Sequence, residues 1–414
     1  MTIKTIIKSD YKKTPIGIIP KDWEVKKFEN IVIRKSERFD PLENPNVKDI
    51  ELDSLDQKTG KIINIHNSSD FKSSKYTFLK GDVLFGRLRP YLRKYWLAEF
   101  DGVCSSEIWV LKNKKNITSE YLFYSVQTKY YLRFADISSG TKMPRSDWSV
   151  VKNAKLPIPP LPEQKAIADC LTTWDKGIEK LTQLIASKKE QKKGLMQQLL
   201  TGKKRLDGFE EEWKEVRIDA LGETFNGLTG KSKKDFGEGK PYVTYLNTFR
   251  NNKIDEKIKF DYVHIKEGEN QSKLKYGDLI FTTSSETPNE VGMSSVVLFS
   301  PIDDLYLNSF CFGLRLNNFN TLNPGFAVFL LRGICFRSEM YKLAQGSTRF
   351  NLSKSSFKNV ILKLPVVQEQ IAIAEVLTTA DKEIELLEKK LETFKTQKKG
   401  LMQVLLTGEK RIID

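Results

Sequence analysis

Two long stretches of the chain carry apolar residues at alternating spacings of four and three. In the first stretch these residues are Ile167, Leu171, Trp174, Ile178, Leu181 and Ile185, and the pattern resumes in register at Leu195 and Leu199. In the second stretch they are Ile373, Leu377, Ile384, Leu387, Leu391, Phe394, Leu401 and Leu405. A heptad pattern of this length is typical of a coiled coil. We therefore predict two long helices, each with an apolar seam.

The two stretches are copies of one another. At a constant offset of 206 residues, 24 of 39 positions from Glu163 onward are identical, including the block QKKGLMQ. Both copies follow prolines, in LPIPPLPEQ and LKLPVVQEQ, and both end in LLTG with a glycine, Gly202 or Gly408, where a helix would terminate. At Lys192 and Lys398 the same seam position is a lysine in both copies. The repeat therefore predicts the same helix twice.

A heptad seam needs a partner helix, and the closest candidate for each copy is the other copy. Similar bodies ahead of similar helices favour a pseudo-twofold, antiparallel coiled coil, although the repeat alone leaves the direction open. A helix of 39 residues would span about 58 Å and could act as a spacer. The alternative is that each helix only covers the core of its own domain.

The remainder of the chain divides into two bodies with β-rich runs separated by Gly, Asp, Asn and Pro. Such runs include KYTFLKGDVLFGRL and VCSSEIWVLK in the first body and DLIFTTS, SSVVLFS and FCFGLRL in the second. We predict mixed α/β (α+β) domains with one helix each, at TSEYLFYSVQTKYYLRF and GFAVFLLRGICFRSEMYKL. The expected boundaries are 1–157 and 203–363 for the bodies, 158–202 for the first helix, and 364–414 for the second helix with its tail.

The charge of the chain points to a polyanionic partner. Its formal net charge is +15 over 414 residues, and the two repeat helices are close to neutral, so the excess lies in the bodies. The four cysteines are widely spaced and form no CxxC pair, so the sequence suggests neither a zinc ribbon nor a disulfide framework and favours a reducing cytosol. No stretch is long and apolar enough to predict a membrane span.

Candidate DNA contacts follow from basic and polar clusters. The run GRLRPYLRKYW places Arg87, Arg89, Arg93 and Lys94 among aromatic residues, which suits phosphate contact or guanine reading. The alternative is a solvated strand edge with its tyrosines packed inside.

Two further loops lie at matching positions before the repeat helices. SSGTKMPRSDW offers Lys142 and Arg145, and AQGSTRFNLSK offers Arg349 and Lys354. The polar run TTSSETPNE, with Thr283 and Ser284, occupies the place in the second body where the first body has its arginine cluster. Gly, Ser and Thr would permit close approach to a phosphate, but they are also ordinary turn residues.

Catalytic motifs are missing. The nearest string to the NPPY-like tetrad of adenine methyltransferases is IPPL, and FNGLTGKS has phenylalanine where a phosphate loop needs its first glycine. The two histidines, His66 and His264, are far apart, which excludes a histidine-rich metal site. Scattered carboxylates form no compact constellation. We expect no catalytic residue, no metal site and no cofactor in this chain.

Two bodies, each followed by a proline-bounded PEQ or QEQ segment and a helix closing in QKKGLMQ, LLTG and KR, resemble the specificity subunit of type I restriction-modification enzymes. The resemblance covers essentially the whole chain. It implies two target recognition domains that each read one half of a bipartite double-stranded DNA sequence, and an antiparallel coiled coil that sets the gap and docks two modification subunits. It further implies adenine methylation with S-adenosylmethionine in those subunits, and ATP- and Mg²⁺-dependent cleavage in restriction subunits.

Two other functions remain open at this stage. A basic coiled-coil scaffold would bind DNA without sequence choice, and a self-contained nuclease or methyltransferase would act alone.

Overall fold

The computed structural model describes residues 2–4, 10–42, 46–139, 142–302 and 304–413. By internal packing the chain forms two compact units. Unit 1 contains Met1–Thr182 and Lys389–Asp414, and unit 2 contains Gln183–Glu388. The two longest helices, α5 (Leu161–Leu199) and α11 (Val367–Leu405), each have 39 residues and contribute one half to each unit.

Unit 1 is built on two sheets. Its strands are β1 (Thr2–Lys4), β2 (Tyr11–Thr14), β3 (Gly17–Pro20), β4 (Glu24–Lys27), β5 (Val32–Lys35), β6 (Arg38–Phe39), β7 (Lys48–Ile50), β8 (His66–Asn67), β9 (Lys75–Phe78), β10 (Val83–Gly86), β11 (Tyr95–Leu97), β12 (Gly102–Ser105), β13 (Ile108–Asn113), β14 (Ser138–Ser139), β15 (Arg145–Ser146), β16 (Lys155–Ile158) and β30 (Arg411–Ile413). Its short helices are α1 (Phe28–Ile31), α2 (Ser119–Ser125), α3 (Lys129–Ala135) and α4 (Trp148–Val151).

The central antiparallel sheet of unit 1 has the order β11-β10-β13-β5, and a second sheet has the order β6-β9-β12-β7-β8. Successive side chains of a strand point to opposite faces. On β10, Val83 and Phe85 accordingly belong to the core shared with the helices, whereas Leu84 belongs to a smaller core that also includes residues of the second sheet. Both faces of β10 are therefore buried.

Unit 2 repeats this arrangement. Its strands are β17 (Lys214–Arg217), β18 (Gly222–Asn226), β19 (Phe236–Val243), β20 (Lys253–Ile254), β21 (Asp261–Val263), β22 (Leu279–Thr282), β23 (Ser284–Ser285), β24 (Ser294–Val297), β25 (Tyr306–Leu307), β26 (Cys311–Leu316), β27 (Ala344–Gln345), β28 (Phe350–Leu352) and β29 (Ile361–Leu364). Its short helices are α6 (Ile218–Leu221), α7 (Tyr245–Arg250), α8 (Pro324–Leu330), α9 (Ile334–Leu343) and α10 (Lys354–Lys358).

The main sheet of unit 2 has the order β18-β26-β22-β24-β20. In unit 1, β10 pairs antiparallel with β13, which pairs with β5; in unit 2, β22 pairs antiparallel with β26, which pairs with β18. The mixed α/β class and the position of every β-rich run named above are confirmed.

The prediction of one helix per body is wrong, because each body has two short helices at this place. In unit 1 the break falls between α2 and α3, where the Thr128 side chain accepts a hydrogen bond from the backbone of Tyr131 and caps the second helix. In unit 2 it falls between α8 and α9, with Gly333 in an extended conformation as the N-cap. A hydrophobic pattern that runs through a break does not reveal the cap.

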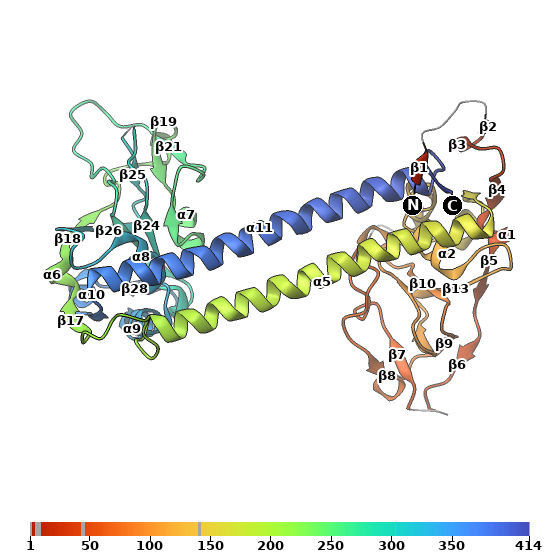
Figure 1. Cartoon of the computed structure of the whole chain (residues 1–414), viewed down its shortest axis with the longest axis horizontal. Helices are drawn as coiled ribbons and strands as arrows, with labels where there is room; N and C mark the ends of the chain where they lie inside the picture. Colours follow the sequence, from red (N-terminus) through yellow and green to blue (C-terminus); the bar gives the residue numbers. More distant parts are fainter. Residues whose placement is uncertain (1, 5–9, 43–45, 140–141, 303, 414) are drawn as a thin grey trace. The chain divides into compact units, whose positions relative to one another are not determined.

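Within each unit, the halves of the two long helices run antiparallel. In unit 1 the C-terminal part of α11 lies beside the N-terminal part of α5 (Figure 1), and the rings of Trp174 and Phe394 meet edge-on with centroids 5.3 Å apart. All sixteen predicted seam residues are at least half-buried. The buried ones are Ile167, Leu171, Leu181, Ile185, Leu199, Ile373, Leu377, Ile384 and Leu405, and the half-buried ones are Trp174, Ile178, Leu195, Leu387, Leu391, Phe394 and Leu401.

The ends of the seam also belong to the globular cores. Ile167 and Leu171 at the start of α5, together with Leu405 at the end of α11, are part of the main core of unit 1. Ile373 and Leu377 play the same part in unit 2 with Leu199. The coiled-coil interpretation and the interpretation as a helix that covers its own domain therefore each hold for part of the length. The first turns of each helix cover a body, and the middle turns pack against the other helix.

The same arginine–glutamate ion pair occurs in both units and joins the first turn of each long helix to the segment that follows the end of the other. In unit 1 the guanidinium of Arg411 binds Glu163 with nitrogen–oxygen distances of 3.0 and 2.6 Å, and the indole of Trp23 also donates to Glu163. In unit 2, Arg205 binds Glu369 at 2.6 and 2.7 Å. The arginine of each KR motif thus neutralises a buried glutamate, which would otherwise be costly to desolvate.

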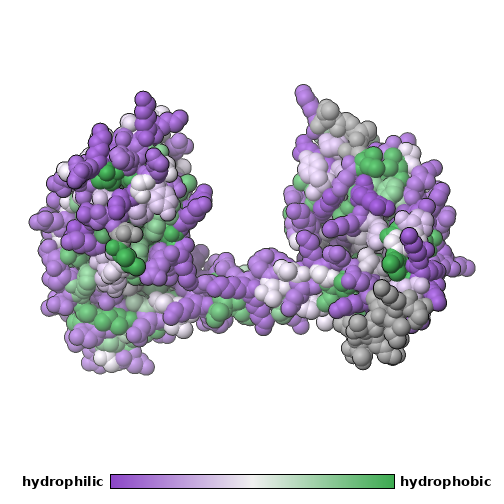
Figure 2. All heavy atoms as spheres, turned by 90° about the horizontal axis from the view of Figure 1, so that it is seen from above, coloured by the Kyte–Doolittle hydropathy of each residue, from purple (hydrophilic) through white to green (hydrophobic). Residues whose placement is uncertain are grey.

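The two ends of the described chain meet in unit 1, where β1 and β30 form an antiparallel pair. Gly202 and Gly408 have φ values of +70° and +73°, the left-handed conformation that ends a helix. In the described part of the chain, no helix is long and apolar enough to cross a membrane. The face of each unit drawn in Figure 2 is mostly hydrophilic, with smaller hydrophobic patches.

Candidate nucleic-acid interface

Both units build the candidate interface on the same backbone frame. In unit 1 the backbone N–H of Arg87, just after β10, donates to Glu107, and the Arg87 carbonyl accepts from Ser146, each at 2.9 Å. In unit 2 the N–H of Thr283, just after β22, donates to Phe310, and the Thr283 carbonyl accepts from Leu352, also at 2.9 Å. Arg87 and Thr283 are therefore equivalent positions, as are Glu107 and Phe310.

Three of the predicted cations of unit 1 are engaged inside the unit. Arg93 makes two hydrogen bonds to the carboxylate of Asp136, at 2.6 and 2.7 Å. The Lys94 ammonium donates to the carbonyl oxygen of Leu52, and burial lowers the pKa of Lys94. Arg145 forms a forked pair with Glu107, at 2.9 and 2.8 Å, and these hydrogen bonds raise the pKa of Arg145.

Arg87 and Arg89 differ from those cations because, among the described residues, neither forms an ion pair or side-chain hydrogen bond with a carboxylate, although a hydrogen bond from the Ser149 backbone and, less strongly, the charge of Arg87 lower the pKa of nearby Asp147. The Arg87 guanidinium carbon lies 5.8 Å from the ring centre of Trp109, and its Nε is buried without a hydrogen bond in the described structure. Arg89 is exposed, with a left-handed φ of 51° ahead of Pro90. Lys142 is exposed as well, next to residues 140 and 141 of the same loop, which lie outside the described residues.

Two packed tryptophans, Trp109 and Trp148, lie next to Arg87 and Arg34. Trp109 of β13 packs edge-on against Trp148 of α4 with ring centroids 5.5 Å apart, and the exposed Arg34 of β5 lies 5.2 Å from the ring centre of Trp148. The indole nitrogen of Trp109 is buried and has no hydrogen-bond partner in the described structure. Two guanidinium groups thus rest on two indoles, an arrangement that suits stacking and anion contact.

Unit 2 presents smaller polar groups on the same frame. The Thr283 hydroxyl donates to the carbonyl of Phe310 at 2.8 Å, and Ser284 is almost fully buried. Arg349 donates to the Ser284 hydroxyl at 3.2 Å and lies 5.5 Å from the ring centre of Phe310. Lys354 contacts Asn226 and lies 5.6 Å from the ring centre of Phe312, and burial lowers the pKa of Lys354.

The structure brings the predicted residues of each unit onto one frame, and it adds residues that the sequence reasoning missed. These are Arg34 and Trp148 in unit 1 and Asn226 and Phe310 in unit 2. Arg34 lies on a strand and Trp148 begins a four-residue helix, so neither belongs to a basic run. The repeat could have indicated Trp148, because at the offset of 206 residues Trp148 occupies the position of Lys354, which was itself a predicted contact residue.

Fold and interface define a class: a duplicated α/β protein with a paired long-helix element and, in each unit, a basic surface backed by aromatic rings. Among the residues that the structure describes, no group of three or more His, Cys, Asp or Glu side chains could hold a metal ion.

Comparison with known proteins identifies the family. The model of the type I restriction modification DNA specificity domain matches residues 20–187 and again residues 210–396. The chain therefore belongs to the family of type I restriction-modification DNA specificity proteins. It is a specificity subunit with two target recognition domains, a non-catalytic component that acts with DNA and other subunits of such a system.

Relatives and solved structures agree with this assignment. The type I restriction enzyme MjaVIII specificity subunit of Methanocaldococcus jannaschii is 28% identical over 324 residues, or 75% of each chain. The putative MjaX specificity subunit of the same organism is 26% identical over 97% of each chain. The HsdS subunit from Thermoanaerobacter tengcongensis has a similar fold, with a TM-score of 0.54 at 19% identity, covering 94% of this chain and 98% of that one.

Proposed function

We propose that each body reads one half of a bipartite, asymmetric double-stranded DNA target and that the helix pair sets the gap between the halves. The observation that carries this proposal is one backbone frame that holds different side chains in the two units, Arg87 with Trp109 in one and Thr283 with Phe310 in the other. Side chains at base edges determine sequence choice, so unlike side chains on like frames would read unlike sequences.

Within unit 1 we assign base or phosphate contact to Arg34, Arg87, Arg89 and Lys142. None of these cations forms an ion pair or side-chain hydrogen bond with a carboxylate among the described residues, and Asp147 interacts with Arg34 and Arg87 only through space, which leaves each cation available for a phosphate or a guanine. In unit 2 we assign the same role to Arg349, with Thr283 and Ser284 beside it.

We assign a supporting role to the four cations that the bodies engage internally. Arg93, Lys94, Arg145 and Lys354 hold neighbouring segments in place through their bonds to protein atoms. The expected domain boundaries, 1–157, 158–202, 203–363 and 364–414, serve as the units to exchange in experiments.

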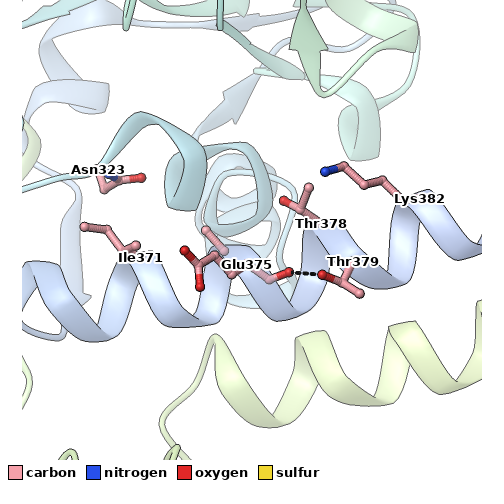
Figure 3. Close-up of a pocket in the computed structure, with 7 residues that line it drawn as sticks. Asn323, Ile371, Glu375, Thr378, Thr379 and Lys382 are labelled. Carbon is pink, nitrogen blue, oxygen red and sulfur yellow. Dashed lines mark hydrogen bonds between the residues drawn. The ribbon is translucent and has the colours of Figure 1, made fainter.

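We further propose that the outer faces of the long helices dock two modification subunits. Two identical partners need the same surface twice, and the copies carry identical outward residues, such as Thr173 with Lys176 and Thr379 with Lys382. On α11 this face includes a shallow groove lined in part by Thr378, Thr379 and Lys382 (Figure 3). S-adenosylmethionine, ATP and Mg²⁺ would bind in the modification and restriction subunits, in the cytoplasm with the DNA.

Body exchange tests this proposal. The full chain is expressed with its modification subunits, and the methylated motif is determined by methylome sequencing. Replacing the body 203–363 by that of a relative should change one half-site and keep the other half-site and the gap. A change in both half-sites would contradict modular reading. Binding to random and selected duplexes with equal affinity would instead favour a scaffold without sequence choice.

A further inference from the structure

A lysine interrupts the apolar seam at the same position of both long helices. In unit 2 the ammonium group of Lys192 on α5 contacts the carboxylate of Asp381 on α11. In unit 1, Lys398 on α11 contacts Asp175 on α5. Lys192 matches Lys398 in the repeat, and Asp175 matches Asp381. The two ion pairs are therefore one interaction that forms twice.

Each of these lysines also touches a short helix of the body. Lys192 lies 5.5 Å from the ring centre of Phe329 on α8, and Lys398 lies 5.5 Å from that of Tyr124 on α2. The Tyr124 hydroxyl donates to Asp175 at 2.8 Å, and burial, reinforced by Asp175, raises the pKa of Tyr124, so that this donor keeps its proton. We call Lys398, Asp175 and Tyr124 junction 1, and Lys192, Asp381 and Phe329 junction 2.

The junctions discriminate between the two possible directions of the helix pair. In a parallel, in-register pair, matching seam positions face each other, so Lys192 would meet Lys398. The side chains of these lysines are only 19% and 14% exposed, and two like charges in so little water would repel strongly. In the antiparallel pair each lysine meets the aspartate of the other copy instead. A slip of one heptad would separate both lysines from their aspartates.

Other ion pairs between the helices lack this reciprocity. Lys188 binds Glu383 and Lys189 binds Glu388 in unit 2 at 2.8 and 2.7 Å, and these side chains are 30% to 56% exposed. At the positions that match Lys188 and Glu383, the other copy has Phe394 and Gly177. Exposed pairs of this kind contribute little to stability. In a parallel arrangement Lys188 would meet Phe394, so this position does not disfavour that direction. Lys189 matches Lys395, but both side chains are at least half exposed, so the repulsion between them would be weak.

We propose that junctions 1 and 2 determine the direction and register of the helix pair and, through the register, the gap between the two DNA half-sites. This inference rests on the proposed bipartite reading. Polar residues at seam positions specify direction and register at some cost in stability, because an apolar residue would pack there more favourably. The lysines are positioning residues, since neither needs to contact DNA to act in this way.

The test is the double variant K192M/K398M, in which a flexible apolar side chain fills each seam position. The full chain, assembled with its modification subunits, is offered duplexes whose gap varies in steps of one base pair. We expect both half-site sequences to be retained and the discrimination between neighbouring gaps to be lost. Retained discrimination would overturn the proposal. The matched control K188M also places a methionine at a seam position, the one that matches Phe394, but it removes a partly exposed pair that has no counterpart in the other copy. K188M should leave the gap unchanged, and an equal loss in K188M would also overturn the proposal.

Two further variants separate the charge pairing from general damage. The swap K192D/D381K restores an attractive pair in junction 2 and should recover gap discrimination that K192M alone loses. Tyr124→Phe gives junction 1 the ring that junction 2 already has at Phe329, so it should keep the gap. A swap that behaves like K192M would show that the pairing is not the determinant.

A measurement without DNA distinguishes failure of this inference from failure of the proposed function. Spin labels are attached at the exposed positions Glu99 and Glu256 as E99C and E256C in a C335S background, one label in each body. K192M/K398M should broaden the distribution of label distances, whereas K188M should not. If the wild-type protein fails to select a bipartite target, the proposed function is wrong. The distribution of label distances would still show whether the junctions determine the register of the helix pair. An unchanged distribution would overturn the inference.

Discussion

The two units present the same frame with opposite chemistry. After β10, unit 1 places Arg87 over an indole, with a carboxylate, Glu107, next along the frame. After β22, unit 2 places Thr283 at the same point, with Phe310 in place of the carboxylate. Arg145 of unit 1 is neutralised by that carboxylate, whereas Arg349 of unit 2 lies over the phenyl ring and keeps its charge available. Unit 1 therefore projects charge from the strand end, and unit 2 projects it from the loop before α10.

This difference shows how one fold can carry two specificities. The hydrogen bonds that define the frame involve backbone atoms alone, so they survive a change of every side chain around them. The buried faces of β10 and β22 remain apolar in both units. Only the residues at the strand ends and in the following loops change, which is where sequence choice can vary without loss of the fold.

The units also differ in how the segment after the helix α2 or α8 is tied to the rest of the body, and a change at this segment should have a large effect on stability. Arg332, directly after α8, donates at 2.7 to 3.0 Å to the carbonyls of Ser294, Thr248, Phe249 and Asn251. Burial lowers the pKa of Arg332 to about 10. The side chain of the equivalent residue of unit 1, Gln127, donates to the carbonyl of Phe123 on α2, and among the described residues it forms no other hydrogen bond. Unit 2 thus relies on a buried guanidinium where unit 1 does not.

Arg332→Gln should destabilise unit 2 by about 2 to 4 kcal/mol, because several buried carbonyls lose their donor. Denaturant unfolding would report the loss, and hydrogen exchange should locate it at 248–251 and 294. The control R250Q makes the same change at an exposed arginine of α7 and should have little effect. If R332Q unfolds like wild type, the two units are braced alike and this part of the comparison fails.

Arg87→Ala should weaken the first half-site and leave the second unchanged. Loss of one well-placed arginine contact costs about 1 to 3 kcal/mol, a rise of about 5-fold to 150-fold in the Kd for duplexes that carry the cognate first half-site. The measurement is a binding titration at fixed salt with one half-site randomised at a time.

The matched control for that variant is R93A. Arg93 belongs to the same basic run but is bound to Asp136, so its removal should change DNA affinity much less than removal of Arg87. Equal losses in the two variants would show that the internal pairing does not distinguish contacting from supporting arginines.

The repeat and the hydrophobic periods were sufficient to predict the two long helices and the buried strands β9, β10, β12, β13, β22, β24 and β26. Heptads and alternation report burial directly, so the seam residues and runs such as KYTFLKGDVLFGRL could be assigned without a structure. The break between α2 and α3 escaped because Thr128 caps a helix inside an unbroken apolar pattern. The pairing of the seam lysines escaped because each finds its aspartate 189 or 223 residues away in the chain.

The candidate interface was only partly predictable for a related reason. A basic run such as GRLRPYLRKYW shows that cations are present, but it does not show which of them are neutralised by residues distant in sequence. Asp136 and Leu52 engage Arg93 and Lys94 from 43 and 42 residues away. Arg34 and Trp148 come from separate elements and meet only in the folded unit. The charge clusters of the sequence thus indicated where the candidate DNA surface lies. Only the tertiary contacts show which of its cations remain available for DNA.

A smaller change should follow from removing the charge of Glu107, whose position on the frame is taken by Phe310 in unit 2. Glu107→Gln would remove the forked ion pair with Arg145 while preserving the shape of the side chain. Because the two side chains are 37% and 27% exposed, stability should change little. Arg145 stays protonated with or without its partner, so the change adds one uncompensated positive charge to unit 1, and the slope of log affinity against log salt should steepen by about one. E99Q removes a distant exposed carboxylate as the control, and weaker binding by E107Q would mean that the ion pair between Glu107 and Arg145 holds the contacting residues of unit 1 in position.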